Sequence, residues 1–205
     1  MSQTPEEIER LKHAPAIPGL IEVILQRWSP RAFADKPVSK GDLRKIFEAA
    51  RWAASSFNEQ PWRFFVGQKG DTTYKRIFDS LVEFNQSWAG SAPVLILSAA
   101  SKTFAHNGAP NNFAIHDTGA ATAYLSLQAT ALGMHTHSMA GLDQDKARAA
   151  FDIPDSYHIG AVTALGYLGD VENLPEGLLE RELAPRERKP LSEFVLTDVG
   201  HPADL

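Results

Sequence analysis

The sequence predicts a layered α+β or α/β domain, and two observations support this fold class. First, the chain has 205 residues, of which 43% are hydrophobic, which is enough to build a substantial core. Second, four or five short apolar or β-branched segments are separated by segments with helical spacing. No internal repeat, low-complexity tract or linker divides the chain. We therefore expect a single domain over residues 1–205.

The order of helices and strands follows from start signals, periodicity and turn residues. Ser39 is a suitable N-cap, Asp42 occupies the third helical position, and Leu43, Ile46 and Ala50 then fall on one apolar face. Asp143 is a suitable cap for a helix that ends at residue 151. The expected helices are 5–13, 19–27, the one after Ser39, 71–88, 117 or 118 to 133, 143–151 and 174–183. The expected strands are 62–67, 92–100, 134–140 and 161–168, with a short strand-like segment at 191–196.

The segment 101–112 has no periodicity and contains the loop-forming residues His106, Asn107, Gly108, Pro110 and Asn111. We expect it to be the most mobile part of the chain and consider it a candidate lid.

Composition and charge exclude several classes of function. The net charge of −5 gives no support for a nucleic-acid partner. The absence of cysteine excludes disulfides, thiol nucleophiles and iron–sulfur clusters. The N-terminal MSQTPEEIERLK lacks the apolar core of a signal peptide, and the longest apolar run, 92–100, is too short to cross a bilayer. We expect a cytoplasmic protein with neither a membrane nor a nucleic-acid partner.

Two basic groups suggest a site for an anion. Arg27, Ser29 and Arg31 occupy alternate positions, and two guanidinium groups with a hydroxyl can together satisfy several phosphate oxygens. Solvated surface residues are an equally good interpretation of this spacing. Arg186 and Arg188, followed by Lys189, are more often a solvated patch, yet they can also close on the same phosphate from the other end of the chain.

A neutral polar cluster follows the helix that Ser39 caps. It consists of Ser55, Ser56, Asn58 and Gln60, whose donors and acceptors suit the edge of a heteroaromatic ring. Alternatively, these side chains cap the free backbone groups of a helix end. One ligand with a phosphate at one end and a flat polar ring at the other would use both clusters.

Histidines and sequence motifs give no sign of a metal site or of a nucleophilic enzyme. His135 and His137 lie on one face of an expected strand, but no acidic pair completes a site, so we expect no metal. His116 has no accompanying nucleophile motif. The chain lacks G-x-S-x-G, P-loop, H-E-x-x-H and G-x-G-x-x-G sequences. A nicotinamide cofactor would therefore bind without a Rossmann unit.

Taken together, these segments resemble the FMN-dependent nitroreductase family (NAD(P)H:flavin oxidoreductase-like). The matching pieces occur in the family's order over nearly the whole chain. They are RWSPRAF, AASSFNEQPWRF, the Asn85 segment before APVLIL, the alanine-rich helix ending ALGM, SMAGLD and RERKPLSEFV. The first two pieces together are specific, and the others are weak singly.

The resemblance implies a mixed, mainly antiparallel sheet flanked by helices, in an obligate homodimer with a domain-swapped C-terminal strand. Two FMN molecules would lie in the interface, each touched by both subunits. Independently of the resemblance, a tail such as LSEFVL needs something to pair with.

The resemblance also implies roles for individual residues. Arg27 and Ser29, with Trp28 between them, match phosphate and ribityl contacts, and Arg31 matches the basic residue near the flavin pyrimidine edge, where it would tune the flavin. The remaining matches are Ser55, Ser56 and Asn58 near the ring from the second subunit, Asn85 at the pyrimidine side, Ala140 and Gly141 near N5 and O4, and Arg186 and Arg188 at the phosphate. Some members carry an acidic residue in place of Ala140, which leaves the local polarity open.

The expected function is that of an NAD(P)H-dependent FMN oxidoreductase. NADH or NADPH would pass a hydride to flavin N5 and leave, and a nitroaromatic, quinone or activated-alkene acceptor would follow in a ping-pong mechanism. No side chain acts as a nucleophile. The alternatives are another reaction on the same scaffold (dehalogenation, dehydrogenation or flavin destruction) or a flavin-binding protein without catalysis.

Overall fold

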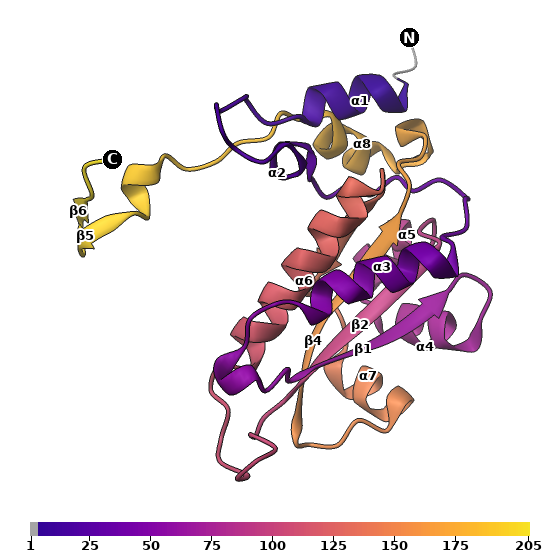
Figure 1. The fold of residues 1–205 in the computed structure, drawn as a ribbon. Helices are drawn as coiled ribbons and strands as arrows, with labels where there is room; N and C mark the ends of the chain where they lie inside the picture. The colour runs from indigo at the N-terminus through magenta and orange to yellow at the C-terminus, as the bar shows by residue number, and fades with distance from the viewer. Residues whose placement is uncertain (1–3) are drawn as a thin grey trace.

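A four-stranded sheet forms the centre of the protein, whose computed structural model describes residues 4–205 (Figure 1). Its strand order is β1-β2-β4-β3, and each neighbouring pair is antiparallel. The strands are β1 (Trp62–Gln68), β2 (Val94–Ser101), β3 (His135–Met139) and β4 (Tyr157–Gly166). Helices cover both faces of this sheet, so the predicted layered α+β fold is confirmed.

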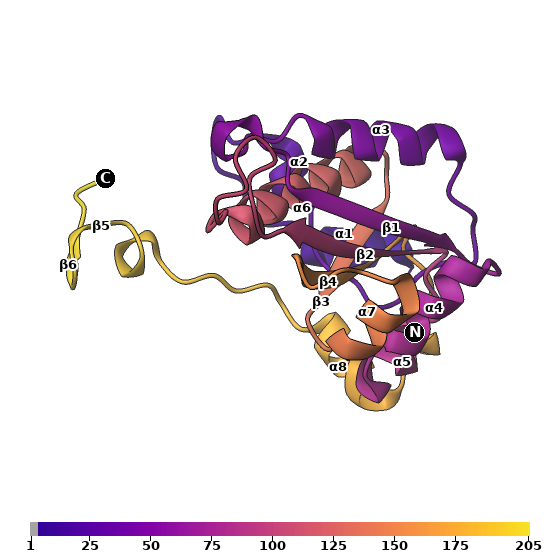
Figure 2. The same ribbon diagram turned by 90° about the horizontal axis from the view of Figure 1, so that it is seen from below.

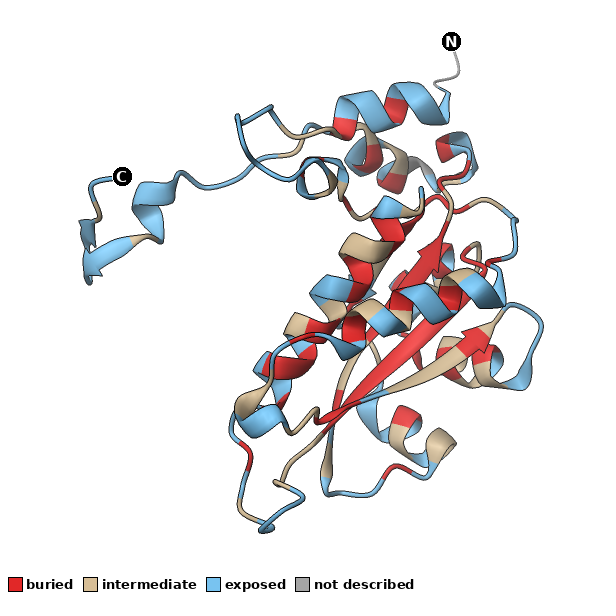
Figure 3. Cartoon of the chain, in the orientation of Figure 1, coloured by how far each residue is buried: buried red, intermediate tan, exposed pale blue. Residues whose placement is uncertain are grey.

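The central strand β2 joins two hydrophobic clusters, one on each face of the sheet. Val94 and Ile96 belong to one cluster and Leu95 and Leu97 to the other, because successive strand side chains point to opposite faces. Nearly the whole strand is therefore buried, as the continuous apolar run predicts (Figure 3).

Different helices cover the two faces (Figure 2). The first face carries α3 (Lys40–Arg51) and α6 (Ala114–Ala131), and the second carries α4 (Thr72–Ser80), α5 (Glu83–Ala89) and α7 (Gln144–Phe151). The remaining elements are α1 (Pro5–Lys12), α2 (Glu22–Gln26), α8 (Glu176–Leu183) and the short 3₁₀ turns η1 (Ser56–Asn58), η2 (Val171–Asn173) and η3 (Leu191–Glu193).

Two predicted helix starts are confirmed in detail. The Ser39 hydroxyl accepts a hydrogen bond from the Asp42 N–H at 3.0 Å, and the Asp143 carboxylate accepts one from the Lys146 N–H at 2.9 Å. Each cap satisfies a backbone donor that the first helical turn leaves unpaired.

The predicted continuous helix over 71–88 is wrong. The backbone is extended at Leu81 and Val82, and the segment forms two helices, α4 and α5. Hydrogen bonds to a distant segment explain the break: the Val82 N–H donates to Gly141 O at 3.1 Å, and the Asp143 N–H donates to Ser80 O at 2.8 Å. These bonds turn α5 so that Asn85 faces Gly141.

Several other bounds differ from the predictions; for example, β2 begins at Val94 rather than 92, and α8 begins at Glu176 rather than 174. Helix α6 begins at Ala114, three residues before 117, and α2 is shorter than 19–27. Strand β4 begins at Tyr157 rather than 161, because its first residues pair with the end of β2. The predicted strand at 191–196 is wrong, since that segment starts with η3 and continues into a small hairpin of β5 (Leu196–Asp198) and β6 (His201–Pro202).

The C-terminal segment extends away from the rest of the molecule (Figures 1 and 2). Its large apolar side chains are exposed, with Phe194 at 60% and Val199 at 90%. Within residues 4–205, no helix combines the length and apolar character that a bilayer crossing requires.

Candidate functional site

A small basic pocket brings together residues from both ends of the chain. Its volume is about 180 Å³. The end of α1, the extended segment after α2, and α8 with the residues that follow it supply its walls. The lining residues are Lys12, Arg27, Trp28, Ser29, Arg31, Arg181, Glu182, Arg186 and Arg188. The structure thus places Arg27, Ser29 and Arg31 beside Arg186 and Arg188, which are more than 150 residues later in the sequence.

Alternation along the extended segment explains how its basic side chains reach the pocket. Trp28 and Pro30 are buried, whereas Arg27, Ser29 and Arg31 are only half-buried. Trp28 packs in a small apolar cluster with Ile8, Ala32, Leu168 and Val171. Because successive side chains of an extended chain point in opposite directions, Arg27, Ser29 and Arg31 lie on one side of the segment. Trp28 also borders the pocket, although its ring packs in that cluster.

A half-buried histidine on β3 contacts this extended segment. His137 on β3 lies 2.9 Å through Nδ1 from Pro30 O, so Nδ1 carries the proton and donates. Burial lowers the pKa of His137 to about 4, which keeps the ring neutral.

Arg27 and Arg186 carry positive charges that repel one another across the pocket. Arg27 donates to the Ser29 hydroxyl at 3.2 Å, and its pKa is held below the usual value by burial and then by Arg188. Arg186 donates to the carbonyl groups of Lys12 and Leu25, and its pKa is lowered by burial and then by Arg27 and Arg188. In the part of the chain that the structure describes, no carboxylate pairs with Arg27 or Arg186. A bound anion would relieve this repulsion.

Arg31 differs from its neighbours because it is paired with Glu182. The Glu182 side chain is 1% exposed and accepts hydrogen bonds from the Arg31 N–H at 2.6 Å, the Ala32 N–H at 3.3 Å and the Arg31 guanidinium at 3.3 Å. The sequence analysis missed Glu182. Its position four residues after Leu178, on the apolar side of α8, is the signal that it faces inward.

Asn85, Ala140 and Gly141 form a second group. The Asn85 side-chain amide donates to Gly141 O at 2.8 Å and is 7% exposed, while Ala140 is exposed. A Cβ at residue 141 would lie 2.6 Å from Asn85 Nδ2, so this close approach requires glycine.

Ser55, Ser56 and Asn58 form a third group, in a tightly held turn. Phe57, Asn58 and Gln60 have positive φ angles of 53°, 55° and 51°, a conformation that costs energy for residues with a Cβ. The turn persists because Ser55 Oγ accepts the Gln60 N–H at 3.0 Å and Asp117 Oδ2 accepts the Ser56 N–H at 2.9 Å. Asp117 is 4% exposed, and the sequence analysis treated it only as a possible helix start.

The candidate lid, residues 101–112, is attached to this turn. The Ala105 N–H donates to Glu59 Oε1 at 2.9 Å, and the ring of Phe104 packs edge-on against Phe57 with centroids 5.6 Å apart. The two segments therefore form one surface, on which Phe57 is 83% exposed.

One subunit does not bring all the candidate residues together. The basic pocket lies beside α1 and α8, whereas Ser55–Asn58 contacts the first turn of α6 (Figure 1). Helix α6, whose 18 residues are about 27 Å long at 1.5 Å per residue, begins beside this turn and ends near α2 (Figure 1).

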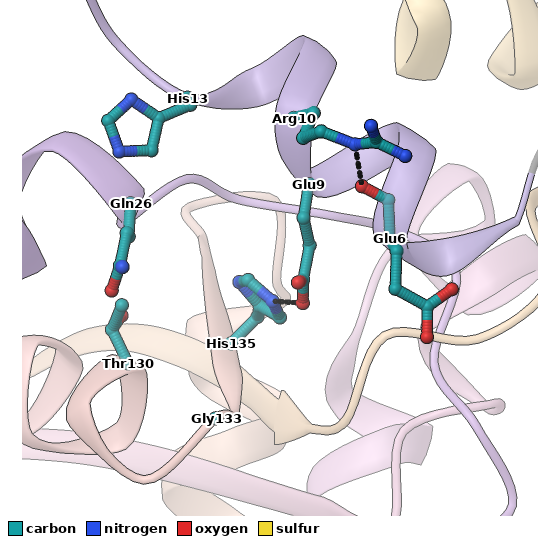
Figure 4. A pocket seen from close by; sticks show the side chains of 8 residues that line it. All are labelled: Glu6, Glu9, Arg10, His13, Gln26, Thr130, Gly133 and His135. Atoms are coloured by element: carbon teal, nitrogen blue, oxygen red, sulfur yellow. Dashed lines mark hydrogen bonds and ion pairs between the residues drawn. The ribbon is translucent and has the colours of Figure 1, made fainter. Parts of the chain in front are cut away.

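A larger cavity of about 520 Å³ lies between α1, the end of α2, the end of α6 and β3 (Figure 4). His135 lines this cavity, contacts Glu9 at 3.4 Å through Nε2, and packs against Trp28 with ring centroids 5.7 Å apart. Burial lowers the pKa of His135. Glu6, Glu9, Arg10 and His13 line this cavity, so it carries charges of both signs. Cationic side chains predominate in the smaller pocket, and we therefore assign the candidate site for an anion to that pocket. Among residues 4–205, no three His, Asp or Glu side chains are grouped to hold a metal.

Comparison with known proteins identifies the same family as the sequence resemblance. The model of the nitroreductase family matches residues 24–87 and 68–167. A protein named NADH dehydrogenase from Thermus thermophilus is 30% identical over 203 residues, which cover 84% of this chain and 92% of that protein. A putative NADH dehydrogenase/NAD(P)H nitroreductase from Xanthomonas oryzae pv. oryzae is 31% identical over 169 residues, covering 73% and 83%.

A solved structure described as an oxidoreductase containing FMN is also similar. It has 37% sequence identity and a TM-score of 0.84, and the match covers 90% of this chain and 94% of that chain.

Proposed function

Because the chain belongs to the nitroreductase family, we propose that it is an FMN-dependent oxidoreductase that uses NADH or NADPH to reduce a small organic acceptor. Nitroaromatics, quinones and activated alkenes are the proposed acceptor classes. The observation that carries this proposal is the basic pocket of about 180 Å³, in which residues from both ends of the chain gather five arginines and a lysine.

The donor set of the pocket fits the phosphate of FMN. Arg27 and Arg186 have no carboxylate partner among the described residues, and the Ser29 hydroxyl lies between the arginines. The buried donors Trp28 Nε1 and Arg31 Nε also lack an acceptor among residues 4–205. A phosphate with its two negative charges would satisfy several of these groups at once.

Bound FMN would supply hydride transfer through N5, first from the nicotinamide and then to the acceptor in a ping-pong sequence. The protein's part is to bind and orient. Asn85 and Gly141 would offer an amide and a backbone edge to the ring, and no side chain would act as a nucleophile.

We further propose that a second copy of the chain completes the site. The candidate turn at Ser55–Asn58 lies far from the basic pocket of its own subunit, so its polar groups would serve the partner's flavin. The exposed apolar side chains of the C-terminal segment, including Phe194, would be covered by that partner.

Two measurements test the proposed chemistry. Heating the purified protein should release FMN, identified by chromatography, and recovery of FAD alone, or of no flavin after reconstitution, would contradict the proposal. Anaerobic addition of NADH or NADPH should bleach the bound flavin within seconds, and an added quinone or nitroaromatic should restore its colour. A flavin that neither donor reduces would instead indicate a binding protein without this activity.

The dimer is tested by deleting residues 190–205. The shortened chain should lose both dimerisation, measured by sedimentation, and FMN retention. A deletion variant that stays dimeric and fully loaded would show that the C-terminal segment is not the connecting arm.

A further inference from the structure

The larger cavity, of about 520 Å³, has the size of a site for a small organic molecule. Helix α1 forms one wall, and the ends of α2 and α6 with the start of β3 form the others. Figure 4 shows the side chains of Gln26 and Thr130 on one side of the space and those of His135 and Glu9 on the other. None of its lining residues lines the basic pocket, so a ligand here would be a second ligand of the protein, beyond the proposed flavin.

The side-chain donors around this space are already used within the protein. Thr130 donates its hydroxyl to the backbone of α6 at 3.0 Å, and Gln26 donates its side-chain amide to Glu22 Oε1 at 3.2 Å. His135 directs Nε2 to Glu9 Oε1 at 3.4 Å. Thr130 Oγ1, Gln26 Oε1 and Glu9 Oε2 remain as acceptors, and within residues 4–205 no donor reaches them.

His135 adds a further acceptor to the same wall. Its side chain is 6% exposed, and burial lowers its pKa, so the ring is neutral at neutral pH. Because Nε2 carries the proton that faces the Glu9 carboxylate, Nδ1 is an acceptor. Nδ1 is buried and has no partner in the part of the chain that the structure describes. The surroundings of the cavity are therefore richer in acceptors than in donors.

The end of α6 favours a positive charge in the same place. Thr130 and Gly133 bring this end to the cavity. The helix has 18 residues and no basic residue in its last turn. Since the C-terminal end of a helix carries partial negative charge, no side chain of α6 offsets it there.

The cationic side chains that line the cavity do not fill this role. The ring nitrogens of His13 each lie 2.7 Å from an acceptor, one from a backbone carbonyl and the other from Glu22 Oε1. Arg10 donates through Nε to the backbone carbonyl of Glu6 at 3.5 Å. Figure 4 shows Arg10 and Glu6 on the far side of Glu9, away from the α6 end of the space.

We propose that this cavity binds a primary amine in its protonated form, with the ammonium group between Glu9, Thr130 and Gln26. An ammonium group has three N–H donors, and alkyl amines, like the lysine side chain, are protonated at neutral pH. The Glu9 carboxylate supplies the opposite charge, and the side-chain oxygens of Thr130 and Gln26 accept the other two hydrogen bonds.

The test titrates the purified full-length protein, with its cofactor bound, with n-butylammonium at constant ionic strength, and follows the imidazole resonances of His135 by NMR. The dissociation constant should be on the order of 1 mM, because a few charge-assisted hydrogen bonds must offset the cost of association. Tetramethylammonium has the same charge but no N–H donor, and it should bind about tenfold more weakly.

Three variants locate the ammonium group. Glu9→Gln removes the charge but keeps an acceptor, and it should weaken n-butylammonium binding about tenfold, whereas Thr130→Val removes only a hydroxyl and should weaken it about threefold. Glu6→Gln is the matched control, because it makes the same change on the same helix, and it should alter the affinity less than about twofold. Circular dichroism checks that each variant is folded, and both glutamates are exposed, so these two variants should fold.

Three results would overturn the proposal. The first is that n-butylammonium leaves the His135 resonances unchanged. The second is equally tight binding of tetramethylammonium, since charge alone would then account for the affinity. The third is equal weakening in Glu6→Gln and Glu9→Gln, which would mean that the cavity attracts cations without a defined position for the ammonium group.

Discussion

Replacing Arg27 with methionine should weaken cofactor binding without lowering the stability of the flavin-free protein. Arg27 is half-buried and has no carboxylate partner in the described chain, and burial together with Arg188 lowers its pKa. A charge-assisted hydrogen bond to phosphate contributes roughly 1.5–3 kcal/mol, so Arg27→Met should weaken FMN binding about 10- to 150-fold. In the flavin-free protein, the same change removes repulsion with Arg186 and Arg188, and the free energy of unfolding should stay constant or rise.

The assays are quenching of flavin fluorescence, which gives the FMN dissociation constant at fixed salt, and urea unfolding of the flavin-free protein. Arg44→Met is the control, since Arg44 is exposed on α3 and should leave both quantities unchanged. The reasoning is refuted if Arg27→Met binds FMN normally. It is also refuted if the flavin-free variant is strongly destabilised, because Arg27 would then have a structural role.

Three further predictions concern the supports of the site. Asp117→Asn should destabilise the protein by about 1–2 kcal/mol, because the hydrogen bond from the Ser56 N–H would then go to a neutral amide oxygen instead of a carboxylate. Hydrogen exchange at the Ser56 amide should become faster, and an unchanged exchange rate would contradict this prediction. Gly141→Ala should cost about 1–3 kcal/mol by displacing buried Asn85, whereas Gly119→Ala, whose Cβ meets no atom within 4 Å, should be neutral or stabilising. Burial lowers the pKa of His137 in the folded chain to about 4, below the ordinary histidine value of 6.5, so the unfolded chain binds the proton more readily. The contribution of neutral His137 to the free energy of unfolding is therefore complete above about pH 6.5 and falls by about 3 kcal/mol as the pH drops to 4. His137→Asn should flatten this part of the pH dependence of the unfolding free energy, measured by urea unfolding at each pH.

Local chemistry in the sequence was enough to place most of the fold. The apolar run at 92–100 predicted a buried strand, and a strand covered on both faces needs no polar alternation. Ser39 and Asp143 marked helix starts because a capping side chain bonds a backbone group only three residues away. The alternate spacing of Arg27, Ser29 and Arg31 likewise anticipated that the three side chains point the same way.

Contacts between segments far apart in the sequence determined the features that capping residues and periodicity did not predict. The helix predicted over 71–88 breaks at Leu81 and Val82 because residues 141–143 take its backbone hydrogen bonds. Sequence spacing placed Arg31 in a possible anion site and gave no carboxylate partner for it, yet Glu182 pairs with it from 151 positions away. Local propensity and periodicity depend on neighbours within one or two turns of the chain. A buried charge depends on its partner, and only the folded chain brings that partner within hydrogen-bonding distance.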